Sequence, residues 1–208
     1  MPSEEFPTVR PATAEDAKDY AGALAKALPD KFHAIFGGQV ERGIRSLADH
    51  YGHLEEESGH FVAEIAGEVA GFLHLITRES GDDGFRAAIP FIQGLGMFRG
   101  IRALLAFTML TRRSLFSRRE REEDVYIAHI IVYPWFHGQG VGKSLLDFAE
   151  EEAGRLGKRR LTLYVAADNA PAIGLYASRG FHTTRVDESR TAQRLLGKRF
   201  WNYMVKDL

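Results

Sequence analysis

A cluster of glycines past the middle of the chain has the spacing of a loop that binds phosphate groups. Gly138, Gly140 and Gly142 follow the apolar run 124–132 and open a segment of helical periodicity, residues 140–156. Glycines at the start of a helix leave its first turn uncovered, where N–H groups without helical partners and the positive end of the dipole attract anions. The sequence therefore predicts a phosphate cradle between a strand and a helix.

Three classes of protein use a loop of this general layout. A dinucleotide-binding fold requires Gly-x-Gly-x-x-Gly, whereas the glycines here follow Gly-x-Gly-x-Gly. The loop of phosphate-binding NTPases ends in Gly-Lys-Ser/Thr, as residues 142–144 do, but it requires a glycine where His137 stands. The loop departs from the patterns of both of these classes. A nucleotide-binding protein is therefore kept only as the least favoured interpretation.

The third class accounts for the loop and for the strand that precedes it. Residues 137–142 resemble the pyrophosphate loop of the GNAT superfamily of acyl-CoA-dependent N-acyltransferases, which reads Arg/Gln-x-x-Gly-x-Gly/Ala after a strand ending Val-x-Pro. Val132 and Pro134 match the strand end, and Gly140 and Gly142 match the glycines. His137 departs from the usual Arg or Gln, so the side-chain contact to the phosphate is the part of the pattern that this chain lacks.

A second block supports the same resemblance independently. Residues 169–181 are similar to the family pattern Asn-x-x-Ala-x-x-Leu-Tyr-x-x-x-Gly-Phe, beginning at Asn169 and including Tyr176. The gap between the two blocks accommodates one helix and one strand, as the family fold requires. The resemblance covers residues 8–77 and 124–206.

The resemblance implies an enzyme that transfers an acetyl or other short acyl group from acetyl-CoA to an unidentified primary amine. The amine attacks the thioester directly in a ternary complex, and no metal takes part. CoA binding is assigned to the strand end, the loop, the start of the next helix and the second block: Ile131, Val132, His137, Gly138, Gln139, Gly140, Val141, Gly142, Lys143, Asn169 and Tyr176. Gly142→Val is expected to weaken CoA binding and to leave the fold intact.

Tyr176 takes the family's role of proton donor to the departing thiolate. A phenol with a reference pKa of about 10 is protonated at pH 7, as that role requires. The alternative is that Tyr176 only fills one face of its helix. Asn169 is expected either to bond the CoA arm or to cap its own helix.

The base that takes the proton of the amine is left open by the resemblance. Family members often carry Glu on the strand before the loop, but the matching position here is Tyr126. His129 lies on the same predicted strand and can accept a proton near neutral pH, while a buried structural histidine is the alternative. Alternation along a strand places the two side chains on opposite faces unless a bulge intervenes. Glu64 is a weaker candidate.

The elements that position these residues predict an α/β fold. Strands are expected at 9–11, 60–65, 69–77, 124–132, 160–166, 181–186 and 200–205. Helices are expected at 13–27, 140–156 and 169–178, and a helical region broken near Gly37 and Gly38 is expected at 32–54. Pro29 is expected to end the first helix. Strands alternate with helices only in the second half, which favours a mixed sheet. The resemblance implies a mostly antiparallel sheet with a central splayed parallel pair, helices on both faces, and one domain over residues 1–208.

Residues 78–123 form an insert that the family pattern does not contain. Its central part, residues 85–119, carries seven arginines and no acidic residue, and apolar residues recur there at helical spacing. Three interpretations stay open: a helical insert packed on the core, a lid or homodimer element beside the site, and a helix that binds a membrane surface.

Composition excludes several classes of function. The 208 residues carry a net charge of −1, so there is no overall field to hold nucleic acid. The chain has no cysteine, hence no disulfide or thiolate metal site, and His50 and His53 have no third ligand at a fixed spacing, so no metal centre is expected. The longest apolar stretch, 103–110, is too short to span a bilayer. A cytoplasmic protein is the simplest interpretation.

Two interpretations of the function are therefore carried forward. The first is a GNAT-like N-acetyltransferase. The second is a non-catalytic acyl-CoA-binding or regulatory module that retains the loop but does not turn over its ligand.

Overall fold

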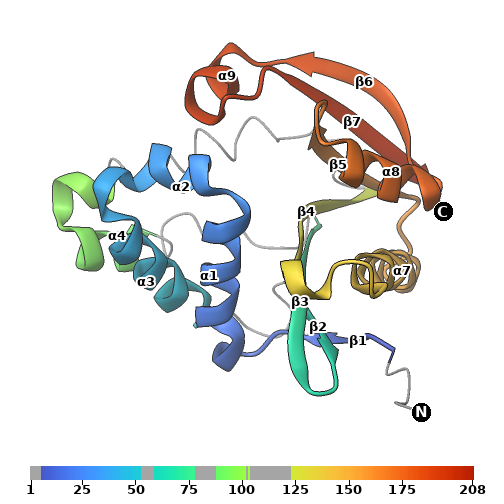
Figure 1. Cartoon of the computed structure of the whole chain (residues 1–208), viewed down its shortest axis with the longest axis horizontal. Helices are drawn as coiled ribbons and strands as arrows, with labels where there is room; N and C mark the ends of the chain where they lie inside the picture. The colour runs from blue at the N-terminus through green and yellow to red at the C-terminus, as the bar shows by residue number, and fades with distance from the viewer. Residues whose placement is uncertain (1–5, 53–58, 78–87, 102, 104–122) are drawn as a thin grey trace.

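The computed structural model of the protein describes residues 6–52, 59–77, 88–101, 103 and 123–208. These residues form a seven-stranded sheet with helices on both faces (Figure 1). The strands are β1 (Thr8–Pro11), β2 (His60–Ile65), β3 (Glu68–Ile76), β4 (Asp124–Val132), β5 (Arg160–Ala166), β6 (His182–Glu188) and β7 (Phe200–Asp207). The helices are α1 (Ala17–Ala27), α2 (Pro29–Phe36), α3 (Val40–Tyr51), α4 (Ala88–Leu95), α7 (Val141–Arg155), α8 (Ala170–Ser178) and α9 (Arg190–Leu196), with 3-10 turns η1 (Ala14–Asp16), η2 (Gly37–Gln39) and η3 (Pro134–Phe136).

The strand order is β1-β2-β3-β4-β5-β7-β6. Neighbouring strands run antiparallel except for β4 and β5, which run parallel at the centre of the sheet. This confirms the predicted mixed α/β fold with one central parallel pair. The parallel pair arises because α7 carries the chain from the end of β4 back to the start of β5, as a crossover between parallel strands requires.

Two apolar cores lie on opposite faces of the sheet. Leu73, Leu145 and Leu163 belong to the core under α7 and α8. Tyr20, Phe36 and Phe72 belong to the core under α1, α2 and α3. In Figure 1 the first helical layer lies to the right of the strands and the second lies to the left.

The predicted element boundaries hold to within a few residues, with two differences. Pro29 ends α1 as expected, but it also occupies the first position of α2, where its fixed φ and missing N–H suit a helix start. The second difference is α9, which the sequence did not predict. It is seven residues long, and its N-cap is Ser189, whose hydroxyl accepts from the N–H of Ala192 at 3.1 Å.

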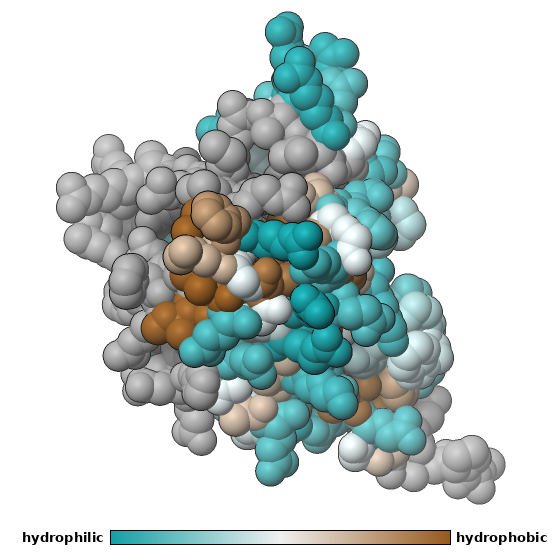
Figure 2. Space-filling view, turned by 90° about the vertical axis from the view of Figure 1, so that its left-hand side faces the viewer, coloured by the Kyte–Doolittle hydropathy of each residue, from teal (hydrophilic) through white to brown (hydrophobic). Residues whose placement is uncertain are grey.

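The described part of the insert belongs to the helical layer of α1 to α3. Helix α4 packs against α3, and large hydrophobic side chains of α4 and the following helical turn are exposed: Ile89, Met97, Phe98 and Ile101. Figure 2 views this side of the molecule and shows a hydrophobic patch on it. The rest of the insert, including Leu104 and Leu105, lies outside the described residues, so its lid, dimer and membrane interpretations stay predictions.

None of the described helices combines the length and the apolar character that crossing a membrane requires.

Candidate active site

The sheet opens between β4 and β5. The two strands pair in register only from Asp124 with Arg160 to Ile127 with Leu163. An ion pair of 2.9 Å between the Asp124 carboxylate and the Arg160 guanidinium holds the joined end. Beyond it, residues 129–132 of β4 pair with β3, and residues 164–166 of β5 pair with β7. The facing edges then carry backbone polar groups that need partners, which is where a ligand can lie.

The glycine loop lies at the open end of β4. Gly138 and Gly140 have φ of +80° and +83°, a conformation that favours glycine, and Gly140 is the N-cap residue of α7. The first N–H groups of α7 have no partners within the helix and meet the positive end of its dipole. This geometry suits an anion at the start of α7, and the phosphate cradle itself stays a prediction.

Two side chains of the loop turn back onto its own backbone. The His137 ring lies 3.1 Å from the carbonyl oxygen of Val132, measured from Nε2, and the Gln139 amide donates to the carbonyl of Trp135 at 2.9 Å. Both side chains thus hold the loop against the end of β4. His137, the residue that departs from the family pattern, has a structural contact that Arg or Gln at the same position need not make.

Gly142 has a packing role that the sequence did not indicate. A Cβ at this position would lie 3.0 Å from Cδ2 of Leu175 in α8, tighter than ordinary contact. The Leu175 side chain would have to shift by a few tenths of an ångström to admit the valine. The expectation that Gly142→Val leaves the fold intact stays a prediction, and loss of CoA binding in that variant isolates the loop only if its thermal stability is unchanged.

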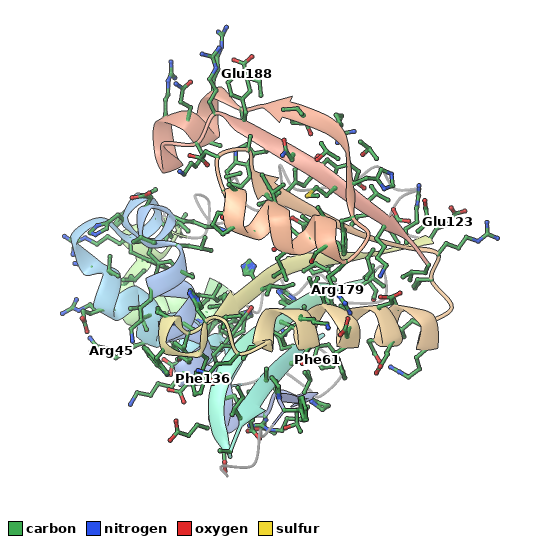
Figure 3. The ribbon with its side chains drawn as sticks, turned by 45° about the vertical axis from the view of Figure 1, so that its right-hand side comes forward. Arg45, Phe61, Glu123, Phe136, Arg179 and Glu188 are labelled. Atoms are coloured by element: carbon green, nitrogen blue, oxygen red, sulfur yellow. The ribbon has the colours of Figure 1, made fainter. Side chains whose placement is uncertain are left out.

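Helix α8 follows β5 and is tied to α7. Arg179, just past the end of α8, extends toward α7 (Figure 3) and forms an ion pair with Asp147. Asn169 caps α8, since its side-chain oxygen accepts from the N–H of Ala172 at 3.3 Å. The cap is thus present, and a contact with the CoA arm stays a prediction.

Tyr176 lies on α8 with its ring packed 5.9 Å from that of Phe181. Burial raises the pKa of its hydroxyl to about 12. No hydrogen bond to this hydroxyl occurs among the described residues. A phenol in that state is protonated at neutral pH and has a proton to give.

A bulge in β4 places Tyr126 and His129 on the same face of the sheet. His74 of β3 pairs with His129, and Leu75 pairs with Ile127, so Ala128 is an extra residue in β4. Without the bulge, alternation would put the two side chains on opposite faces. Both therefore face the layer of α1 to α3.

Three histidines form a row across neighbouring strands on that face. His60 pairs with His74, and His74 pairs with His129. Ring centroids lie 3.8 Å apart for His60 and His74, and 5.9 Å apart for His74 and His129. The Nδ1 atom of His129 is buried and has no hydrogen-bond partner among the described residues. No group of three potential metal ligands was found in the described part of the chain.

Lys31, in the first turn of α2, contributes a positive charge beside this row. Burial lowers the pKa of Lys31 to about 8. Burial, followed by the charges of Lys31 and His60, lowers the pKa of His129 to about 3. Burial also holds the pKa of His74 well below its usual range. At neutral pH the His129 ring is therefore uncharged.

Glu64, the weaker candidate for the base, lies elsewhere. Its carboxylate forms an ion pair of 2.6 Å with Arg10 at the β1 edge of the sheet. Strands β2 and β3 separate that edge from the opening between β4 and β5. The structure thus brings together Tyr126 and His129 and excludes Glu64.

A family model described as the acetyltransferase (GNAT) family matches residues 34–181. An uncharacterised N-acetyltransferase of Methanocaldococcus jannaschii is 37% identical over 70 residues, which are 34% of this chain and 31% of that protein. The ribosomal protein bS18-alanine N-acetyltransferase of Escherichia coli K12 is 36% identical over 64 residues, which are 31% of this chain and 43% of that protein. The matches thus span less than half of these relatives.

Solved structures share the fold along nearly the whole chain. An acetyltransferase crystal structure has a TM-score of 0.60 at 24% identity and covers 96% of this chain and 98% of its own. A Salmonella typhimurium acetyltransferase structure with its cofactor acetyl-CoA has a TM-score of 0.58 at 20% identity, with 97% and 94% covered. The family model covers well over half of the chain, so the chain belongs to the GNAT acetyltransferase family.

Proposed function

We propose that the protein is an N-acetyltransferase that transfers the acetyl group of acetyl-CoA to a primary amine while both are bound. The observation that carries this proposal is the opening between β4 and β5 next to the N-terminus of α7. The unpaired backbone edges of this slot can form hydrogen bonds with the amides of the extended pantetheine arm of CoA. The N–H groups at the start of α7 can bind the CoA pyrophosphate. The N-acetyltransferases named above and the related structure with acetyl-CoA support the choice of donor and acceptor.

In this proposal the CoA pyrophosphate lies on the N–H groups of residues 138–143. The pantetheine arm follows the free edge of β4 at Ile131 and Val132, whose N–H groups also polarise the thioester carbonyl. Asn169 at the start of α8 lies on the other side of the arm. His137 and Gln139 support the loop through the backbone contacts described above.

The reaction is a direct substitution at the thioester carbonyl. The amine nitrogen attacks the carbonyl carbon, forming the C–N bond, and the C–S bond breaks to release the CoA thiolate. Tyr176 gives its proton to the sulfur and recovers one from solvent. The amine loses its proton to solvent, and His129 and Tyr126, on the same face, orient the amine and pass the proton on, because a pKa of about 3 makes the uncharged His129 ring too weak a base to hold it. Holding both substrates in one slot supplies much of the rate.

The test is turnover by the purified chain with acetyl-CoA and a panel of primary amines. Released thiol gives the rate, and mass spectrometry identifies the acetylated amine. Tight CoA binding by calorimetry with no acetylated product from any amine would contradict the proposal and favour the non-catalytic module. Thermal stabilisation by ATP and magnesium, with none by CoA, would instead favour a nucleotide-binding protein.

A further inference from the structure

Tyr164 lies at the opening between β4 and β5, on the side proposed for the acceptor. It is the first residue of β5 past the joined end of the two strands. Leu163 and Val165, on either side of it, belong to the core under α7 and α8. Alternation along the strand therefore places Tyr164 on the opposite face, which is the face of Tyr126 and His129. Its side chain is thus at the edge of the slot, and the reaction described above gives it no role.

A bulge in β6 brings two charged side chains to the same face. The pairing of β6 with β7 shifts by one residue between Thr183 and Arg185. Beyond this shift Arg185 pairs with Tyr203 of β7, and Tyr203 pairs on its other side with Tyr164. Without the bulge, Arg185 and Asp187 would lie on the face of α7 and α8. The shift therefore places both charged side chains where they can reach Tyr164.

The side chains of Tyr164, Asp187 and Arg185 are all hydrogen-bonded to one another. The Tyr164 hydroxyl donates to Oδ2 of Asp187 at 2.7 Å, and Nη2 of Arg185 donates to the Tyr164 oxygen at 2.6 Å. Nε of Arg185 lies 2.9 Å from Oδ1 of Asp187, and the guanidinium lies 5.0 Å from the centre of the Tyr203 ring. A guanidinium can only donate and a carboxylate can only accept. The direction of the hydroxyl is therefore fixed, with its proton on the side of Asp187.

This direction bears on the proton that the amine nitrogen loses. His129 is too weak a base to hold that proton, so it needs a further acceptor on its way to solvent. Burial, followed by the hydrogen bond to Asp187, raises the pKa of Tyr164. The phenol is therefore protonated at neutral pH and can take up a proton only if it gives one up. Asp187 lies where the second proton would go, and its side chain is 39% exposed, so it can pass that proton to water.

We propose that Tyr164 and Asp187 form a relay that carries the proton of the amine nitrogen to solvent, with Arg185 holding both side chains in place. The inference rests on the proposed acetyl transfer. As the C–N bond forms, the nitrogen becomes more acidic, and its N–H bond breaks while a new O–H bond forms at Tyr164. The original O–H bond of Tyr164 breaks in the same step, and its proton passes to Oδ2 of Asp187 and then to water. Both residues return to their starting states.

The first test measures kcat/KM for the best amine of the panel in two variants. Tyr164→Phe removes only the hydroxyl and keeps a ring that packs 5.0 Å from that of Tyr203. We expect its kcat/KM to fall by about 10²-fold or more. Asp187→Asn can still accept from the hydroxyl but cannot take its proton, so it should be similarly slow. Wild-type kcat/KM in either variant would overturn the inference.

Glu188→Gln is the matched control. Glu188 is the next residue, at the end of β6 (Figure 3). It is exposed to a similar extent and also forms an ion pair, with Arg199 at 2.8 Å. Glu188→Gln should keep the wild-type kcat/KM. An equal loss in Glu188→Gln and Asp187→Asn would assign the effect to the charge of the hairpin and overturn the inference.

Rescue by a small carboxylate separates proton transfer from a structural loss. The Asp187 side chain is reached from solvent, so formate can take the place of the carboxylate that Asp187→Ala removes. Formate should raise kcat/KM of Asp187→Ala by about 10-fold, because it restores a proton acceptor. Chloride at the same ionic strength should have no effect, and formate should not rescue Tyr164→Phe. No rescue of Asp187→Ala by formate would overturn the relay.

A further measurement needs no turnover, so it separates this inference from the proposed function. The titration of Tyr164 is followed by NMR in tyrosine-labelled protein, with its signal assigned from Tyr164→Phe. In Asp187→Asn the hydroxyl should titrate at a lower pH than in the wild type, because the carboxylate no longer disfavours the phenolate. In Glu188→Gln it should titrate as in the wild type.

The two failures are then distinguishable. An unchanged titration of Tyr164 in Asp187→Asn would overturn the inference even if acetyl transfer is found. A coupled pair in a protein that gives no product with any amine would overturn the proposed function and the relay with it.

Discussion

Tyr176 combines a protonated hydroxyl with a ring held by packing, and these two properties can be separated by mutation. Tyr176→Phe keeps the contact with Phe181 and removes only the proton donor. We expect kcat to fall by about 10²- to 10⁴-fold with little change in acetyl-CoA affinity, because the proton moves in the transition state. Steady-state kinetics and calorimetry check both parts.

The nature of the leaving thiol provides the control for this variant. A donor whose thiol leaves more easily needs the proton less, so its rate should fall less in Tyr176→Phe. Wild-type kcat across the pH range, in a reaction limited by chemistry, would reject Tyr176 as the acid. A bound water or another side chain would then supply the proton.

At the scale of elements, the loop before α7 can be tested without enlarging a glycine. Lys143 is exposed in the first turn of α7. Lys143→Glu places a negative charge where the proposed pyrophosphate lies, so CoA should bind about 10- to 100-fold more weakly. The same charge favours the helix N-terminus, so thermal stability should stay equal or rise. Calorimetry with CoA and thermal unfolding would show changes of opposite sign.

Lys18→Glu is the matched control, because Lys18 is also an exposed lysine in the first turn of a helix, α1. It should leave CoA affinity unchanged. Equal weakening in both variants would mean that overall charge, and not the loop, governs CoA binding.

The elements were largely predictable from the sequence because most are long and have clear start and stop signals. Strand β4 and helix α7 lie within one residue of their predicted ranges, and Asn169 caps α8. Helix α9 was missed, since one short charged turn between two strands gives little periodic signal.

The row of histidines was not predictable, because two bulges determine it. Ala70 is an extra residue in β3 and Ala128 is one in β4. Counting back from the turn at residues 66–67 without the first bulge would pair His60 with Leu73. A shift of one residue moves a side chain to the other face of a sheet. The effect of the Lys31 charge on His129 was not predictable for a different reason. Lys31 lies on a helix almost 100 residues earlier in the sequence, and no local pattern relates the two positions.

For the molecule as a whole, the row of histidines makes stability depend on pH. His129 has a folded pKa of about 3, while an unfolded histidine titrates near about 6.5. Between these values the unfolded chain binds the extra proton, so stability is complete above pH 6.5 and falls as the pH falls. At pH 5 this group alone should lower the free energy of unfolding by about 2 kcal/mol. Lys31 titrates above this range and does not contribute to the change.

Urea unfolding at pH 7.5 and pH 5 measures this loss. In His129→Gln the loss should be smaller than in the wild type by about 2 kcal/mol. His33→Gln replaces an exposed histidine of α2 and should retain the wild-type loss. A His129→Gln protein that is as acid-sensitive as the wild type would assign the effect to other groups.

The short pairing of β4 with β5 also has a consequence for cooperativity. Among the described strands, the pairing from Asp124 to Ile127 of β4 alone links β1–β4 to β5, β7 and β6 by sheet hydrogen bonds, so the sheet has a weak joint at its centre. Segments with few shared hydrogen bonds can open separately from the rest of a fold. Native-state hydrogen exchange should therefore show β5, β6 and β7 exchanging as one unit, at a lower opening free energy than β2 and β3. A ligand that forms hydrogen bonds with both free edges would link the two units. Bound CoA would then take the place of the hydrogen bonds that β4 and β5 do not form with each other.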